Sequence, residues 1–136
     1  EVKKYPDREL NHYIEFNSDQ LDQTAKQYGV SREDMLKQYD LDDEDEFNAV
    51  NEDSSKLRVK QEMLIQYIAD KENLSYTDKE KEALIKSFEA QGYDADAIEQ
   101  QTGRTLEDYV HIELLYEKVL DFLLDNANIT GAPTPE

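Results

Sequence analysis

The sequence contains no cysteine, only three prolines and only four glycines among its 136 residues. The absence of cysteine excludes disulfide bonds, thiolate chemistry and cysteine-based metal sites. No proline lies between Pro6 and Pro133, so no proline interrupts a long helix in the interior of the chain. No apolar run approaches the roughly 18 residues that a membrane-spanning helix needs, and no signal peptide is visible. These absences favour a helical chain without direct membrane contact.

Positive charge is also scarce. The 15 lysines and arginines are outnumbered by 33 aspartates and glutamates, which gives a formal net charge of −18 and a pI of about 4.3. Such a surface repels nucleic-acid phosphates and anionic lipid head groups, so we expect neither nucleic acid nor membrane as a partner. It suits partners that are basic or that expose apolar stretches.

Apolar residues recur at helical spacing along the whole chain, and helix-start and helix-stop signals divide them into six segments. The Thr77–Glu80 stretch is a T-x-x-E capping box, whereas Ser31–Asp34 is a weaker version with aspartate in the last position. No segment shows the alternation typical of a strand. We therefore predict an all-α fold with helices from Pro6 to Gly29, Ser31 through Tyr39, the N-cap Asp42 to about Asn73, Thr77 to Gly92, Asp94 to Gln101, and Thr105 to about Ala127.

An internal repeat links the two halves of the chain. Leu21, Ala25 and Gly29 match Leu84, Phe88 and Gly92 at a constant offset of 63 positions. Near the ends of the two long helices the offset falls to 55, where the stretches 73–75 and 128–130 correspond. The repeat predicts an elongated domain of two units, each made of a helix, a short helix and a long helix that projects as an arm.

The first long helix carries two apolar stripes. The main stripe, which should face the core, contains Phe47, Val50, Leu57, Leu64, Ile65 and Ile68. The second contains Val59, Met63 and Tyr67, and the repeat places Leu114, Lys118 and Phe122 at the equivalent positions of the last helix. The second stripe is suited to hold apolar polypeptide segments, with methionine as the adaptable element. The alternative is that this helix packs on two sides within the domain. The candidate client-binding residues are Val59, Met63, Tyr67, Leu114 and Phe122.

Signatures of catalysis and of metal binding are missing. The sequence has no nucleophile elbow, no P-loop and no dinucleotide-binding glycine pattern, and His12 and His111 are far apart. Asp40, Asp42 and Glu44 resemble the start of a calcium-binding loop, but its sixth and twelfth positions hold Asp45 and Asn51 in place of glycine and glutamate. We expect no enzyme, no cofactor and no metal.

Three passages resemble the C-terminal chaperone domain of bacterial trigger factor. Residues 57–80, LRVKQEMLIQYIADKENLSYTDKE, are similar to the family's long helix and the acidic helix start that follows it. Residues 116–130, YEKVLDFLLDNANIT, are similar to its closing helix. At the N-terminus, Glu1-Val2-Lys3 followed by residues 6–10, PDREL, resembles the exit from an FKBP-type prolyl isomerase domain.

The resemblance implies a helical cradle that binds unfolded or nascent polypeptides without ATP. It implies an exit linker at 1–6, a chaperone domain at 7–130 and a tail at 131–136. Isomerase activity would then lie in an upstream domain outside this chain, and the location would be cytoplasmic, or extracytoplasmic through a missing N-terminal anchor. The alternative is a structural or dimerisation module of such an isomerase that binds no client, and a homodimer is left open.

Overall fold

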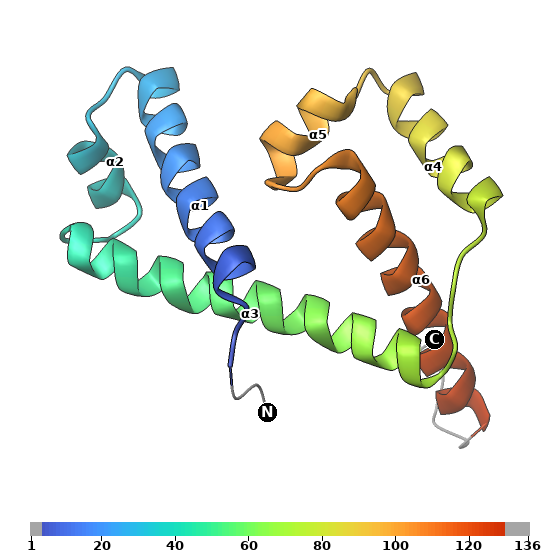
Figure 1. Ribbon diagram of the computed structural model, residues 1–136. Coiled ribbons are helices and arrows are strands. Elements are labelled where there is room, and N and C mark those ends of the chain that lie inside the picture. The colour runs from blue at the N-terminus through green and yellow to red at the C-terminus, as the bar shows by residue number, and fades with distance from the viewer. Residues whose placement is uncertain (1–3, 130–136) are drawn as a thin grey trace. The chain divides into compact units, whose positions relative to one another are not determined.

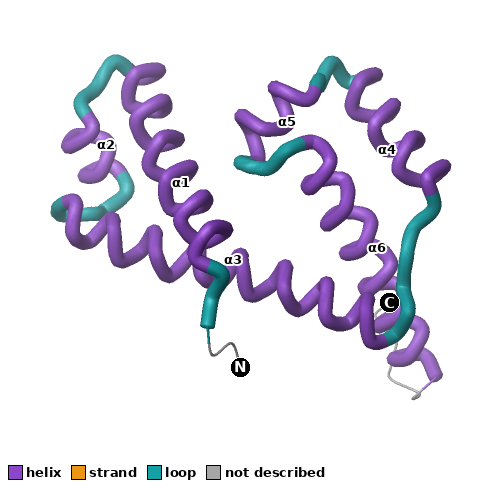
Figure 2. The backbone as a smooth tube through the Cα atoms, viewed as in Figure 1, coloured by secondary structure: helices purple, strands orange, loops and turns teal. Residues whose placement is uncertain are grey.

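The structure, a computed structural model, describes residues 4–129 and consists of six helices joined by short loops (Figures 1 and 2). No strand occurs among these residues, which confirms the all-α prediction. The predicted tail at 131–136 and the first three residues of the predicted linker lie outside the described part. In chain order the helices are α1 (Asp7–Tyr28), α2 (Arg32–Gln38), α3 (Glu44–Lys71), α4 (Asp78–Ala90), α5 (Ala95–Thr102) and α6 (Leu106–Ile129).

Most helices begin where the sequence predicts, because side-chain caps satisfy the first backbone N–H groups. The Thr77 side chain accepts from the N–H of Glu80, and the Glu80 carboxylate accepts from the N–H of Thr77, which completes the capping box of α4. The start of α3 is a correction: Asp43 accepts from the N–H of Glu46 at 2.9 Å, so Asp43, and not Asp42, is the N-cap. The N–H of Asp42 instead donates to the Glu46 carboxylate at 2.7 Å.

The repeat is visible in the backbone. After α1 the N–H of Val30 donates to the carbonyl of Ala25, and after α4 the N–H of Tyr93 donates to the carbonyl of Phe88. The glycine between each pair of elements, Gly29 with φ +68° or Gly92 with φ +87°, adopts the left-handed conformation that lets the chain leave the helix. The structure thus confirms the order helix, short helix, long helix in both halves.

The chain divides into two compact units, residues 1–61 and 62–136, and the boundary falls inside α3. The core of the first unit is formed by the buried residues Leu21, Ala25, Met35 and Leu36. The core of the second is formed by Ala69, Leu115 and Val119, with Ile65 and Ile68 packed against them. The last turns of α3 therefore belong with α6, so the compact units do not follow the repeat.

The residues of α3 that are buried differ from those of the predicted main stripe. Val50, Leu57 and Leu64 of the predicted main stripe are each about half exposed, whereas Asn51, Ser55 and Val59 are buried. The neighbouring helix supplies hydrogen-bond partners for the polar side chains: Asn51 Nδ2 donates to the carbonyl of Ile14 at 2.9 Å, and Asn17 Nδ2 donates to Asn51 Oδ1 at 2.8 Å. Because these amide groups are satisfied inside, α3 can bury polar Asn51 and Ser55 together with apolar Val59.

Replacing Thr77 by alanine is expected to lower the free energy of unfolding by about 1 kcal/mol, because the N–H of Glu80 loses its acceptor. The effect is measured by urea denaturation followed by circular dichroism at 222 nm. The matched control is Lys79→Ala, an exposed position in the same helical turn. Equal destabilisation by the two variants would show that the capping box contributes nothing specific.

Candidate functional site

Large apolar side chains lie exposed at many places on both units. They are most frequent on α3 and α6, the two longest helices. The half-exposed to mostly exposed ones are Tyr28, Tyr39, Val50, Leu57, Met63, Leu64, Tyr67, Tyr116, Leu120, Leu123 and Leu124. Isolated exposed leucines need no explanation, but rows of them on one helix face indicate an interaction surface.

One such row lies on α6 and is called the α6 stripe: Tyr116, Leu120, Leu123 and Leu124, all exposed. Their spacing of three and four residues puts them on one side of the helix, while Val110, Leu114, Leu115 and Val119 on other sides are buried. Helix α6 is therefore apolar both toward the core and toward solvent.

The α6 stripe is accompanied by negative charge. Exposed Glu113, Glu117 and Asp121 each stand three residues before Tyr116, Leu120 and Leu124. Residues three apart are neighbours on a helix surface, so three of the four apolar side chains, all except Leu123, have a carboxylate beside them. An acidic border keeps such a surface hydrated and opposes its association with another negatively charged protein.

The five predicted client-binding residues fall into different environments. Val59 and Leu114 are buried, and Phe122 is partly buried. Met63 and Tyr67 remain exposed, at 39% and 61% of their surface. Val59 and Leu114 therefore offer no surface to another molecule in this structure. The client-binding role itself stays a prediction.

The first unit contains an open hollow of about 440 Å³ between α1 and α3. Tyr39 and Val50, both more than half exposed, lie among its lining residues. Leu41 and Phe47 also line the hollow, and both are half-buried. The complete lining comprises Asn17, Gln20, Leu21, Thr24, Tyr39, Leu41, Phe47, Val50, Asn51 and Ser54. The sequence gives no direct sign of this hollow, because its walls come from three separate segments.

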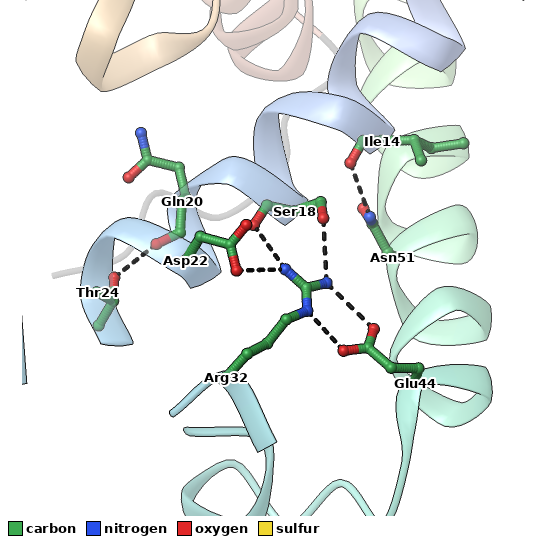
Figure 3. A network of polar contacts seen from close by, with 8 residues as sticks. All are labelled: Ile14, Ser18, Gln20, Asp22, Thr24, Arg32, Glu44 and Asn51. Carbon is green, nitrogen blue, oxygen red and sulfur yellow. Dashed lines mark hydrogen bonds and ion pairs between the residues drawn. The ribbon is translucent and has the colours of Figure 1, made fainter. Parts of the chain in front are cut away.

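Arg32, at the first residue of α2, joins all three helices of the first unit (Figure 3). Its guanidinium donates to the carbonyl and hydroxyl oxygens of Ser18, to Asp22 at 2.9 Å and to both carboxylate oxygens of Glu44 at 2.6 and 3.2 Å. The hydrogen bond to Glu44, followed by the one to Asp22, raises the pKa of Arg32 above its usual value. The guanidinium also lies 5.1 Å from the ring centroid of Phe47, which lines the hollow. Arg32 thereby fixes one wall of the hollow.

Polar groups that could suggest catalysis serve the packing of the second unit. His111 Nδ1 lies 2.7 Å from the hydroxyl of Tyr76, and its Nε2 lies 2.8 Å from Gln66 Oε1. With a hydrogen on Nε2, the imidazole accepts from Tyr76 and donates to Gln66. A second polar connection, the ion pair between Arg104 and Glu62, links the start of α6 to α3. These contacts hold the side chains of His111 and Arg104 against α3.

The surface of the second unit also contains ion pairs between helices. Lys118 lies 2.7 Å from Glu80, and Lys81 lies 2.6 Å from Glu107. The hydrogen bonds lower the pKa of Glu80 and of Glu107 and raise the pKa of both lysines. Each pair connects α4 with α6, so these lysines position helices.

The acidic stretch that resembles a calcium loop is occupied by internal contacts. Glu44 binds Arg32, Asp43 caps α3, and Asn51 is part of the buried amide network. Within residues 4–129 no group of three or more histidine or acidic side chains is arranged to hold a metal ion. No described helix combines the length and the apolar character needed to cross a bilayer.

Comparison with known proteins gives a consistent result. The family described as "Bacterial trigger factor protein (TF) C-terminus" matches residues 2–125. The chain is similar to trigger factor from Bacillus mycoides, with 29% identity over 122 residues, and to trigger factor from Bacillus licheniformis, with 31% identity over 108 residues. The matches cover 89% and 79% of this chain but 27% and 25% of the relatives, so the chain spans about a quarter of their length. No solved structure matches the chain significantly.

Proposed function

The chain belongs to the family of bacterial trigger factor C-termini, and on this premise we propose that it is a chaperone domain that binds unfolded or nascent polypeptides without ATP. The observation that carries the proposal is the α6 stripe, a row of apolar side chains exposed on a helix whose core side is already filled. Within the described residues these four side chains are exposed and do not contribute to the core. Such a row is suited to a binding partner that exposes apolar segments of its own.

Exposed Met63, Leu64 and Tyr67 on the last turns of α3 extend this argument within the second unit. Shallow, exposed apolar residues on helices give weak contacts that adapt to many sequences, whereas a deep pocket selects one ligand. Weak and adaptable contact is what a holding chaperone needs, because it must release its clients without an energy source.

The alternative function, a dimerisation module without client binding, is opposed by charge. The chain has a formal net charge of −18, and the α6 stripe is bordered by carboxylates. A second copy would bring two such borders together, and like charges at an interface oppose association. Unfolded polypeptides of neutral or positive charge meet no such barrier.

The remaining parts of the proposal follow from the family. We expect prolyl isomerase activity to belong to a separate upstream domain and no enzymatic activity from this chain. We also expect a cytoplasmic location, with an anchored extracytoplasmic protein as the alternative. The upstream domain and the location are checked by the complete gene, which would show an isomerase domain or an anchor before Glu1.

The test is suppression of aggregation of a chemically unfolded client by the 136-residue chain. In the variant Leu120→Gln/Leu124→Gln, two half-exposed leucines are replaced by a residue that also favours helix. Losing about 1 kcal/mol of apolar contact at each site should weaken client binding roughly 30-fold. A second variant, Met63→Gln/Tyr67→Gln, tests the exposed part of the predicted stripe in the same way.

The control is Lys86→Gln/Glu89→Gln, two exposed positions on α4, which should protect the client like the unchanged chain. Circular dichroism verifies that each variant keeps its helices. Full protection by both stripe variants would exclude these residues as the contact. A tight dimer in light scattering, together with no protection by the unchanged chain, would establish the dimerisation module instead.

A further inference from the structure

The lining of the hollow in the first unit has an unusual composition. Charged residues make up 35% of the chain, yet none of the ten lining residues is charged. Half of them are apolar and the others are amides and hydroxyls. A hollow without charge on so acidic a protein differs in kind from the α6 stripe, in which three of the four apolar residues have a carboxylate beside them.

Four of the five polar side chains of the lining are already hydrogen-bonded within the unit. Thr24 Oγ1 donates to the carbonyl of Gln20 at 2.8 Å, Ser54 Oγ donates to the carbonyl of Asn51 at 3.2 Å, and the amides of Asn17 and Asn51 bond to each other. A charged group that entered the hollow would lose its hydration and find no opposite charge there, which is costly. An uncharged apolar side chain would enter without this cost.

Four of the five apolar lining residues are exposed or partly exposed. Tyr39 and Val50 are more than half exposed, with Leu41 and Phe47 half-buried beside them in the lining. Arg32 binds α1 and α3 (Figure 3). Its guanidinium also stacks on the ring of Phe47, so this wall is held before a ligand arrives. A preformed site saves the ordering cost that a flexible surface would have to meet on binding.

From these observations, and resting on the proposed chaperone function, we propose that the hollow is an anchor site for uncharged, apolar stretches of an unfolded polypeptide. Its volume of about 440 Å³ lies within the range of roughly 300–1,000 Å³ typical of ligand sites, so it accommodates apolar side chains of a bound segment. Binding in the hollow is governed by apolar contact and not by the net charge. It is therefore insensitive to salt, in contrast to attraction of basic segments by the acidic surface.

The test uses fluorescence anisotropy with the 136-residue chain and an end-capped peptide of about eight residues, leucine alternating with serine, with a neutral fluorophore. The expected affinity changes less than about twofold between low and high salt. Val50→Asp should weaken binding about tenfold or more, because it removes a contact at the lining and puts a carboxylate there. The control Asn48→Asp adds the same charge to an exposed position of α3 outside the lining and should change the affinity less than about twofold.

A second peptide, with a central leucine replaced by lysine, separates the two modes of binding. The anchor site predicts binding about tenfold weaker, whereas attraction by a chain of charge −18 predicts tighter, salt-sensitive binding. Tighter binding of the lysine peptide, or equal binding of the neutral peptide to Val50→Asp, overturns the anchor site. Tyr39→Ser repeats the test at a second exposed lining residue, in case Val50→Asp disturbs the fold.

The anchor site and the chaperone function can fail separately. If the unchanged chain suppresses aggregation but does not bind the neutral peptide, the hollow is not an anchor while the chaperone function stands. If the unchanged chain neither suppresses aggregation nor binds the peptide, both proposals fall.

Discussion

Replacing Tyr13 by alanine is expected to lower the free energy of unfolding by about 3–5 kcal/mol, the range for removing a large aromatic side chain from a core. Tyr13 is 2% exposed on α1, and the guanidinium of Arg58 on α3 lies 4.0 Å from its ring centroid. The substitution therefore leaves a cavity and removes a cation–π contact between two helices of the first unit. Urea denaturation followed by circular dichroism at 222 nm measures the change.

The same substitution at Tyr28 is the matched control, because Tyr28 lies on the same helix and is 70% exposed. Surface substitutions of this kind change stability by less than about 0.5 kcal/mol. The two variants lose the same atoms and differ only in burial. Similar stabilities of the two variants would contradict the burial of Tyr13 against α3.

Replacing Asn51 by aspartate is expected to destabilise the chain by about 3–5 kcal/mol at neutral pH, the cost of an uncompensated buried charge. Asn51 is 3% exposed, and its Nδ2 group donates to the carbonyl of Ile14. A carboxylate at this place cannot donate, and it lies against the carbonyl oxygen of Ile14. Asn17 and Ser55 can still donate to the new side chain, but they do not replace the lost donor.

The loss should depend on pH in a defined direction. Burial raises the pKa of the new carboxyl group in the folded state above its value in the unfolded chain. The folded state then binds the proton more tightly, so the variant gains stability as the pH falls through the folded pKa toward the unfolded value near about 3.9. The protonated acid can also donate to Ile14, as the amide did.

The control for this experiment is Ser54→Asp, which adds the same charge at an exposed position of α3. Denaturation of both variants from neutral to acidic pH gives the difference that belongs to burial, because general effects of acid on so acidic a chain act on both. A stability difference that does not narrow as the pH falls would show that position 51 is not buried as described.

These two experiments bear on the proposed binding site as well as on stability. The Asn17–Asn51 pair and the buried side of α3 hold α1 against α3 and thereby form the sides of the hollow. Because amides and hydroxyls fill the inner side of α3, its apolar Val50 and Leu57 are left outside. The contact between α1 and α3 is thus partly polar, while the core of the first unit is apolar.

The helices and their order could be predicted because they depend on local physics. Capping side chains such as Thr77, glycines at left-handed positions such as Gly29, and apolar spacing act within a few residues. The start of α3 was predicted one residue too early, because several adjacent aspartates can each accept the same backbone hydrogen bond. The repeat was also predictable, since both halves use the same helix-stop geometry.

The faces of the helices could not be predicted in the same way. Val50, Leu57 and Leu64 form the more regular apolar stripe, yet they are exposed, whereas Asn51, Ser55 and Val59 are buried. Met63 and Tyr67 are exposed as a client site requires, whereas Val59 and Leu114 of the same prediction are buried. A helix with apolar residues on two sides has two candidate core faces, and its sequence does not specify which one a neighbour covers.

The sequence by itself determined six helices, the repeated order of helix, short helix and long helix, a strongly negative surface and a likeness to one family. Each of these properties depends on single residues or on short stretches. Only the tertiary structure decided which side of α3 is buried, where α3 is divided between the two units, and that Arg32 fixes the wall of an uncharged hollow. These features depend on which side chains from distant segments meet. That is settled by the partners available for each hydrogen bond and each apolar surface once the helices pack.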